Sequence, residues 1–323
     1  MTNAGIDRLL AELTSFRPDA PRPRAAGADW REIARLAFEH GLAPMISYQL
    51  EYRWPGLGAP EEVREQLLAV YQGTLGDLVF KLVRLKEALR GEEMPPAALL
   101  GGAATADAFF PHVAFRPTPE LEILVRPAER EAAARAFARE ELRPGRPGPG
   151  GTPFSDGRLV LWVRTALPAL APSAPRVDEL LERSIPARAY GPNARRLAPE
   201  DALLSAVAAL ADEGLVAPRL AFVELRELLL RGGGFWEPEG PALDPARLRE
   251  RAREGGLSRA LWAALEIVAR LFPEAADRAR TLAPELPARA RALLRRLVVE
   301  PMLDPRRLRL VRGERALRRA LLR

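Results

Sequence analysis

The segment that most constrains the fold is 99–125, LLGGAATADAFFPHVAFRPTPELEILV. Its apolar beginning and the Gly101-Gly102 pair predict a strand that ends in a tight turn, because glycine accepts backbone angles that other residues avoid. A second strand is predicted at the end of the segment. Side chains alternate between the two faces of a strand, so Glu120 and Glu122 lie on the same face. Two carboxylates on one face suggest a metal site.

Helical periodicity surrounds this segment on both sides. Apolar residues recur every three or four positions, most regularly from 60 to 89, which predicts a long helix. The order is helices, then a small mixed sheet, then helices again, and this order predicts the α+β class. We therefore expect an N-terminal helical region at 1–90, an α/β core at 91–195 and a C-terminal helical region at 196–323.

The individual elements are predicted from local signals. Asp29 is expected to cap the helix that follows it, and that helix is expected to end at Gly41. The glycine- and proline-rich segment 143–151 is expected to lack regular structure. The other predicted helices are 6–16, 28–39, 44–52, 103–109, 127–141, 199–211, 219–230, 245–254, 257–271 and 288–297, and the predicted strands are 97–100, 121–125, 158–163 and a short one within 182–190.

Composition excludes several classes of site. The chain of 323 residues has no cysteine, which excludes disulfides and thiolate chemistry, and its two histidines are too few for a histidine-rich zinc centre. It lacks an apolar run long enough to cross a membrane and a leader-like beginning. A cytoplasmic protein with no transmembrane segment is therefore expected.

The net charge of +6 is carried almost wholly by arginine in a background rich in alanine and leucine. This bias is typical of a GC-rich genome more than of a binding surface, so a nucleic-acid partner is not expected. The densest basic segment, 306–323, predicts an amphipathic helix with a cationic face. That face is interpreted as solvated or turned toward a partner, with nucleic acid or an anionic membrane surface as alternatives.

The order of several short motifs resembles a known family. The motifs are the A-x-x-HGLAP segment at 37–44, the Gly101-Gly102 turn, Arg116, the acid-x-acid strand at 120–125, and the helical segments at 199–210 and 243–273. In this order they are similar to the uncharacterised nucleotidyltransferase family of the polymerase-beta-like superfamily. The resemblance extends over most of the chain.

The resemblance implies a nucleotidyltransferase-like sheet and a metal-dependent reaction. In such enzymes the glycine turn lets the backbone approach the phosphates of a nucleotide, and carboxylates on two strands hold divalent metal ions. Carried over to this chain, Gly101, Gly102 and Arg116 would bind the nucleotide. Glu120 and Glu122 would be the catalytic residues and metal ligands, with Mg²⁺ as the metal if the protein is active.

The chain departs from the family pattern at the positions that carry the chemistry. The acidic pair is glutamate where aspartate is usual, which moves each carboxylate by roughly 1.5 Å, and Gly101 replaces the lysine often found in the turn. In the later strand, Leu159 and Leu161 stand where polar residues are expected, and only Trp162, otherwise expected in the core, remains. These departures favour a degenerate member, a pseudoenzyme with no cofactor that binds a protein partner or a nucleotide.

Other interpretations stay open at this point. An active, metal-dependent enzyme would transfer a nucleoside monophosphate to a small molecule or protein by means of Glu120 and Glu122. A third hypothesis is a helical interaction module whose basic C-terminal helix docks on an acidic partner. In the simplest structural interpretation, the two glutamates are solvated on an edge strand, Gly101-Gly102 is only a tight turn, and Arg116 forms a salt bridge with one of the glutamates.

Overall fold

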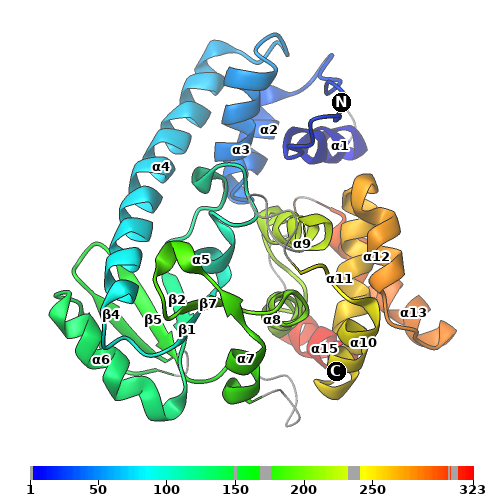
Figure 1. Ribbon diagram of the computed structural model, residues 1–323. Coiled ribbons are helices and arrows are strands. Elements are labelled where there is room, and N and C mark those ends of the chain that lie inside the picture. The colour runs from blue at the N-terminus through cyan, green and yellow to red at the C-terminus, as the bar shows by residue number, and fades with distance from the viewer. Residues whose placement is uncertain (1–2, 149–150, 168–175, 232–240, 305, 307–311) are drawn as a thin grey trace.

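The structure, a computed structural model, describes residues 3–148, 151–167, 176–231, 241–304, 306 and 312–323. Helices surround one mixed sheet, and the longest helix, α4 (Glu61–Arg90), forms one edge of the molecule (Figure 1). This arrangement confirms the α+β class. Within the described ranges, the structure contains no helix that is both long and apolar enough to cross a membrane.

The sheet contains seven strands within the described residues. They are β1 Ala97–Leu100, β2 Leu121–Leu124, β3 Arg143–Pro144, β4 Thr152–Ser155, β5 Val160–Arg164, β6 Ile185–Pro186 and β7 Ala194–Arg196, in the spatial order β3-β4-β5-β2-β1-β7-β6. At the centre, β1 and β2 run antiparallel, β7 lies parallel to β1, and β5 lies parallel to β2. The end of β1 therefore lies beside the beginnings of β2 and β5.

The second helix begins and ends where the local signals predict, whereas the first lies three residues earlier than predicted. The side chain of Asp29 caps the second helix by accepting a hydrogen bond from the backbone N–H of Glu32 at 3.1 Å. Gly41 follows the end of that helix with a φ of +71°, an angle that glycine adopts readily. The helices before α4 are α1 Asn3–Leu13, α2 Trp30–Glu39 and α3 Ala43–Tyr48, and a π-helical turn at Gln49–Arg53 follows α3.

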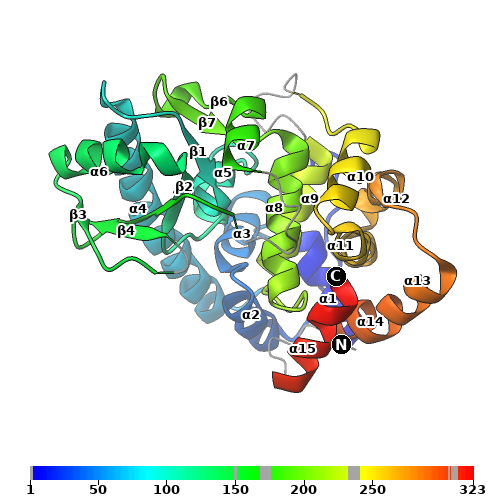
Figure 2. The ribbon, with the colours of Figure 1, turned by 90° about the horizontal axis from the view of Figure 1, so that it is seen from below.

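Helices that follow the sheet form the other half of the molecule. They are α8 Pro199–Asp212, α9 Arg219–Arg231, α10 Pro245–Glu254, α11 Ser258–Leu271, α12 Ala276–Leu282, α13 Ala288–Leu294, α14 Glu300–Met302 and α15 Arg312–Leu322. Both α12 and α14 lie outside the helices that the sequence predicts. Figure 2 shows that α8 stands between the sheet on one side and α10, α11 and α12 on the other.

Three short helices connect the strands, and they correct two predictions. They are α5 Gly101–Thr105, α6 Arg130–Arg139 and α7 Val177–Arg183. The helix predicted at 103–109 is misplaced, because α5 begins in the glycine pair itself and ends at Thr105. The strand predicted within 182–190 is limited to the two residues of β6, since a 3-10 turn at Arg188–Tyr190 occupies the end of that range.

The region that was expected to be a loop, 143–151, contributes the two residues of β3 to the sheet. β3 and β4 pair antiparallel, and β4 continues the ladder to β5. Pro144 and Pro153 lie in these two strands, and a proline usually argues against a strand because it donates no hydrogen bond to the ladder. The prediction for 143–151 is therefore wrong at its beginning, and residues 149–150 lie outside the described residues.

Two large hydrophobic cores lie along α4. Its first half, with Val63 and Leu67, packs into a core that contains residues of both the N-terminal and the C-terminal helices. Its second half, with Leu78 and Leu82, packs with α6 against one face of the sheet. A third, smaller core lies on the other face and includes residues of α7. The two ends of the chain thus share one core, although the whole sheet region separates them in the sequence.

The predicted basic helix at 306–323 is seen in part, because residues 307–311 lie outside the described residues. Within α15, Leu322 and Arg318 are each only 1% exposed, and Leu322 belongs to the large helical core. Arg318 pairs with Glu314 at 3.0 Å. This helix therefore packs on its own chain, and one of its arginines is enclosed there.

Candidate functional site

A cavity of about 430 Å³ lies where β1 ends and β2 begins, and residues of α8 and α9 complete its wall. All five residues that the resemblance assigned to nucleotide and metal line this cavity: Gly101, Gly102, Arg116, Glu120 and Glu122. Its volume is within the roughly 300–1,000 Å³ typical of small-molecule sites. Much of the remaining wall is apolar and includes Leu100, Phe109, Leu197, Ala206, Leu210 and Leu228.

The glycine turn has a structural reason of its own. Gly101 has a φ of +48°, in the left-handed region that favours glycine. A Cβ atom on Gly102 would lie 2.0 Å from Oγ1 of Thr118, which is too close for any side chain. The Thr118 hydroxyl donates to the carbonyl oxygen of Arg116 at 2.9 Å. The turn is therefore packed tightly against the loop that leads to β2.

Glu120 comes directly before β2, and its side chain is held by β5. The indole Nε1–H of Trp162 donates to Oε2 of Glu120 at 2.7 Å. Trp162 is only half-buried, so the expectation that it lies in the core is wrong. Its ring faces the glutamate, and its one polar atom is used there.

Glu122 lies within β2 and forms a two-point ion pair with Arg164 of β5. Nε of Arg164 donates to Oε2 of Glu122 at 2.7 Å, and Nη2 donates to Oε1 at 2.8 Å. The Arg164 side chain is 19% exposed and that of Glu122 is 33% exposed. Pairs with two parallel hydrogen bonds are stronger and more directional than single contacts. Both carboxylate oxygens of Glu122 are therefore engaged by one guanidinium group.

The register between β2 and β5 decides which residues of β5 face the glutamates. Glu122 lies opposite Trp162, so Trp162 and Arg164 share its face of the sheet. Leu159 and Leu161 are fully buried in the core on the opposite face. The prediction that these leucines occupy the positions of polar site residues is therefore wrong. The residue that stands beside Glu122 on this strand is a cation, Arg164.

Arg116 contacts the cavity from the loop before β2. Its Nε donates to Oε2 of Glu224 in α9 at 2.8 Å, and its Nη1 donates to the carbonyl oxygen of Pro117 at 3.0 Å. The other Glu224 oxygen accepts a hydrogen bond from the Thr105 hydroxyl at 3.0 Å. The alternative in which Arg116 pairs with one of the two strand glutamates is therefore wrong. The sheet and α9 are instead joined across the cavity wall.

Sequence patterns did not identify Arg164 or Glu224 as residues of this cavity. Each is separated from its partner by many residues, 42 for Arg164 and 108 for Glu224, so no local spacing marks the pair. For Arg164, the available signal was its position two residues after Trp162, at the end of a predicted strand. For Glu224, an acidic residue within an amphipathic helix gave no sign that it is buried.

The charged groups of the wall do not fit a divalent metal ion. The described part of the chain contains no group of three or more Asp, Glu, His or Cys side chains that could hold one. The guanidinium of Arg164 contacts both oxygens of Glu122, which are the atoms that a metal ion would use. A second cation at the same oxygens would be repelled by the first. The residues present therefore disagree with the metal that the resemblance implies.

Comparison with known proteins identifies one family. Residues 26–273 match the sequence model of a family described as "Uncharacterised nucleotidyltransferase". The match begins just before α2, includes the whole sheet and the cavity residues, and ends directly after α11. The comparisons with curated proteins and with solved structures gave no match. Because this one model spans more than half of the 323 residues, the chain belongs to the uncharacterised nucleotidyltransferase family.

Proposed function

We propose that this chain is a pseudoenzyme of its family that binds a nucleotide in the 430 Å³ cavity without a divalent metal ion and without transferring it. The observation that carries the proposal is the two-point pair between Arg164 and Glu122 in the cavity wall. A permanent positive charge lies there, next to the carboxylate on which a metal would depend. Arginine keeps this charge at every physiological pH.

The engaged carboxylates support the loss of transfer. Transfer of a nucleoside monophosphate needs metal ions that neutralise the triphosphate and activate the acceptor hydroxyl. Both oxygens of Glu122 are held by Arg164, and one oxygen of Glu120 is held by Trp162. Reactions of this kind lose on the order of 10²-fold in rate for a 1 Å error in position. Binding without chemistry is thus the function that these contacts support best.

Arg116 and Arg164 support an anionic ligand. Nε and Nη1 of Arg116 hold Glu224 and Pro117, whereas its Nη2 has no hydrogen-bond partner in the described ranges. A guanidinium group has five N–H donors in one plane and suits the oxygens of a phosphate. In the proposed complex, these two arginines supply the positive charge for the phosphates that a metal ion supplies in an active enzyme.

The apolar part of the wall supports a flat, apolar group such as a nucleobase. Small side chains of α8, Ala202, Ala206 and Ala209, face the cavity and leave room beside Phe109 and Leu210. Ligand sites of this kind combine a mostly apolar lining with a few polar groups that fix orientation. A nucleotide has this division between its base and its phosphates.

Isothermal titration calorimetry with ATP, GTP, CTP and UTP tests the proposal. We expect at least one nucleotide to bind with the same Kd in excess EDTA as in Mg²⁺ or Mn²⁺, because no metal takes part. The same samples should release no pyrophosphate above a protein-free blank. Binding that EDTA abolishes, together with pyrophosphate release, would establish the active, metal-dependent alternative in which Glu120 and Glu122 are ligands.

Two variants make the test specific to the cavity. Arg116→Ala removes a cavity guanidinium and should weaken nucleotide binding about 10-fold or more, the value of a hydrogen bond to a charged group. Arg143→Ala removes an exposed arginine of β3 that does not line the cavity, and it should leave the Kd unchanged. If none of the four nucleotides binds to the wild-type protein, nucleotide binding is ruled out and a protein ligand becomes the leading hypothesis.

A further inference from the structure

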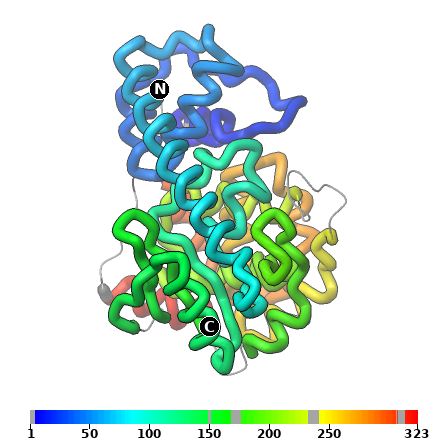
Figure 3. Tube along the Cα trace, turned by 60° about the vertical axis from the view of Figure 1, so that its left-hand side comes forward, coloured from blue at the N-terminus to red at the C-terminus, as the bar shows by residue number. Residues whose placement is uncertain are grey.

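The outward side of α4 carries apolar residues that nothing in the chain's described part covers. Ala69, Gly73, Gly76, Val79 and Val83 are spaced by three or four residues and are all exposed, Val79 by 44% and Val83 by 48%. Figure 3 shows α4 along the outside of the molecule. We call these five residues the outer face of α4. Exposed apolar residues that form one stripe along a helix are typical of an interaction surface.

Packing within the chain does not require the two glycines of the outer face. A Cβ atom on Gly73 or Gly76 would meet no atom within 4 Å. Both glycines lie near the middle of a helix of 30 residues, where glycine is the least favourable residue after proline. Alanine at either position would make the isolated chain more stable. Glycine on an exposed helix face does allow the backbone of another helix to approach closely.

The distribution of charge along α4 indicates which helix packs against its outer face. Its beginning carries Glu61, Glu62 and Glu65, and its last residue is Arg90. Lys86, near the same end, is already engaged by Asp107 and the Tyr190 ring of its own chain. A second α4 in the antiparallel direction brings each acidic end beside the other's basic end, and the two helix dipoles are then opposed as well. A parallel arrangement would put like charges together. We propose that two copies of this chain associate through their outer faces, with the two α4 helices antiparallel about a two-fold axis.

The apolar residues fit this arrangement when the two-fold axis passes beside Gly76. Gly73 of one copy then lies against Val79 of the other, and Ala69 lies against Val83. Each exposed valine of the outer face meets a small residue, as close helix packing requires. The interface is isologous, because each contact occurs twice.

The charged residues at the ends fit the same register. Glu62 of one copy lies beside Arg90 of the other, on both sides of the axis. Glu65 lies opposite Glu87, whose charge is already compensated by Arg84 of its own chain at 2.7 Å. The helix is about 45 Å long, so the outer face offers one long, narrow contact. A contact of this size is at the low end for protein interfaces, so we expect a dimer that dissociates on dilution.

Sedimentation velocity on the full chain over a broad range of concentrations tests the proposal. The mass should rise from 35.5 kDa toward twice that value as the concentration increases. Gly76→Leu fills the space at the axis and favours the helix, so it should keep the fold and weaken the dimer at least 10-fold. Gly313→Leu is the matched control, because Gly313 also lies in a helix and has open space around its Cβ position. A mass of 35.5 kDa at all concentrations, or a dimer that Gly76→Leu leaves intact, overturns the proposal.

A charge exchange tests the antiparallel direction. Glu62→Arg and Arg90→Glu should each weaken the dimer, and the double variant should restore it. The chain has no cysteine, so Gly76→Cys provides a single thiol next to the two-fold axis. Under mild oxidation it should form a disulfide between two copies, whereas Glu65→Cys should not, because its Cα atoms would be too far apart. Equal crosslinking at both positions, or no restoration by the double variant, rules out this register.

Discussion

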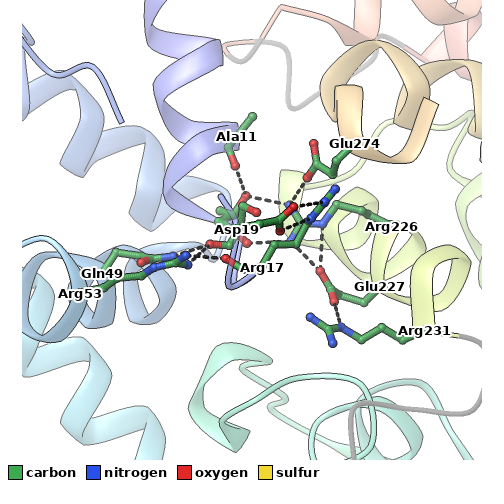
Figure 4. Close-up of polar contacts among 11 residues, drawn as sticks. Ala11, Arg17, Asp19, Gln49, Arg53, Arg226, Glu227, Arg231 and Glu274 are labelled. Atoms are coloured by element: carbon green, nitrogen blue, oxygen red, sulfur yellow. Dashed lines mark hydrogen bonds and ion pairs between the residues drawn. The ribbon is translucent and has the colours of Figure 1, made fainter. Parts of the chain in front are cut away.

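Two arginine–glutamate pairs in this molecule have the same length but very different surroundings. Arg226 of α9 donates to Glu227 at 2.7 Å, and Arg164 donates to Glu122 at 2.7 Å. Arg226 is 1% exposed, and it also donates to the carbonyl oxygen of Thr14 at 2.6 Å. Figure 4 shows this enclosed cluster between α9 and the segment that follows α1. The Arg164 pair, by contrast, lies in the wall of the cavity.

The difference in enclosure separates an anchor within the core from a pair that a ligand can reach. When an enclosed charge loses its partner, no water can take the partner's place, so the loss costs stability. The Arg226 cluster therefore holds α9 firmly to the segment that follows α1. The cavity pair keeps part of its surface, 19% for Arg164 and 33% for Glu122, and solvent screens it. A ligand can therefore reach the exposed part of this pair while the pair itself stays formed. Bond length alone does not distinguish the two roles.

The largest effect is expected when the enclosed cluster is broken. Arg226→Met keeps the approximate size of the side chain but leaves the Thr14 carbonyl and part of Glu227 without a donor. We expect the free energy of unfolding to fall by about 3–5 kcal/mol, as measured by urea titration followed by circular dichroism.

The double variant Arg226→Met/Glu227→Leu is the control for this measurement. It removes both charges, so the loss should be clearly smaller than that of the single variant. The expected order is wild type, double variant, single variant, from most to least stable. A loss below about 1 kcal/mol for the single variant would show that the cluster is not an anchor, since exposed pairs have values of that size.

The second prediction concerns the cavity pair, where a mutation should affect nucleotide binding more than stability. Arg164→Ala should change the free energy of unfolding by less than about 1 kcal/mol, because the pair is partly exposed. The same variant should weaken nucleotide binding about 10-fold or more. Calorimetry and urea titration on one preparation give both values. A large loss of stability with unchanged affinity would assign Arg164 to the same structural class as Arg226.

The comparison also explains which parts of the structure the sequence could predict. The helix at 60–89 and the strand at 97–100 follow from local periodicity, and α4 and β1 agree with them within a residue or so. Which side chains of β5 share a face with Glu122 depends on the register between β5 and β2. No local sequence pattern contains this register. The resemblance therefore placed Leu159 and Leu161 where polar residues of the site are expected, and Arg164 was missed.

The candidate site shows the same division between local and distant information. The glycine turn and the two glutamates were identified because they lie within 22 residues of one another in the sequence. Glu224 belongs to a helix 108 residues from Arg116 and enters the cavity only when the C-terminal helices pack beside the sheet. The family resemblance named five residues that line the cavity, but the ion pairs in the cavity wall depend on tertiary contacts.

The third prediction uses a pair of intermediate enclosure, Asp7 of α1 with Arg219 of α9 at 3.2 Å. Burial raises the pKa of Asp7 to about 6, Arg219 opposes this, and Asp304 adds to it. Because the pKa is higher in the folded state, stability is greatest below the unfolded pKa and falls as the pH rises toward 6. Asp7→Asn removes this dependence. Its stability relative to the wild type should increase by about 1 kcal/mol between pH 4 and pH 7, a value reduced for the exposed part of the side chain.

Thermal unfolding of both proteins across this pH range measures the difference. The mutation retains the size of the side chain and a possible hydrogen bond to Arg219, so only the titration changes. Parallel pH profiles for the two proteins would show that Asp7 keeps its ordinary pKa and that the pair behaves as an exposed one.

The smallest effect is expected at the surface, where Arg35 of α2 pairs with Glu32 at 2.7 Å and with Glu39. The hydrogen bond from Arg35 lowers the pKa of Glu32 to about 2, yet the Arg35 side chain is 45% exposed. Solvent screening and the entropy of a long side chain then offset most of the attraction, so Arg35→Gln should destabilise by less than about 0.5 kcal/mol. The difference in Tm from the wild type should disappear in 1 M salt, where the Debye length is about 3 Å. A loss that approaches that of Arg226→Met, or that persists in salt, would show that enclosure does not rank the ion pairs of this molecule.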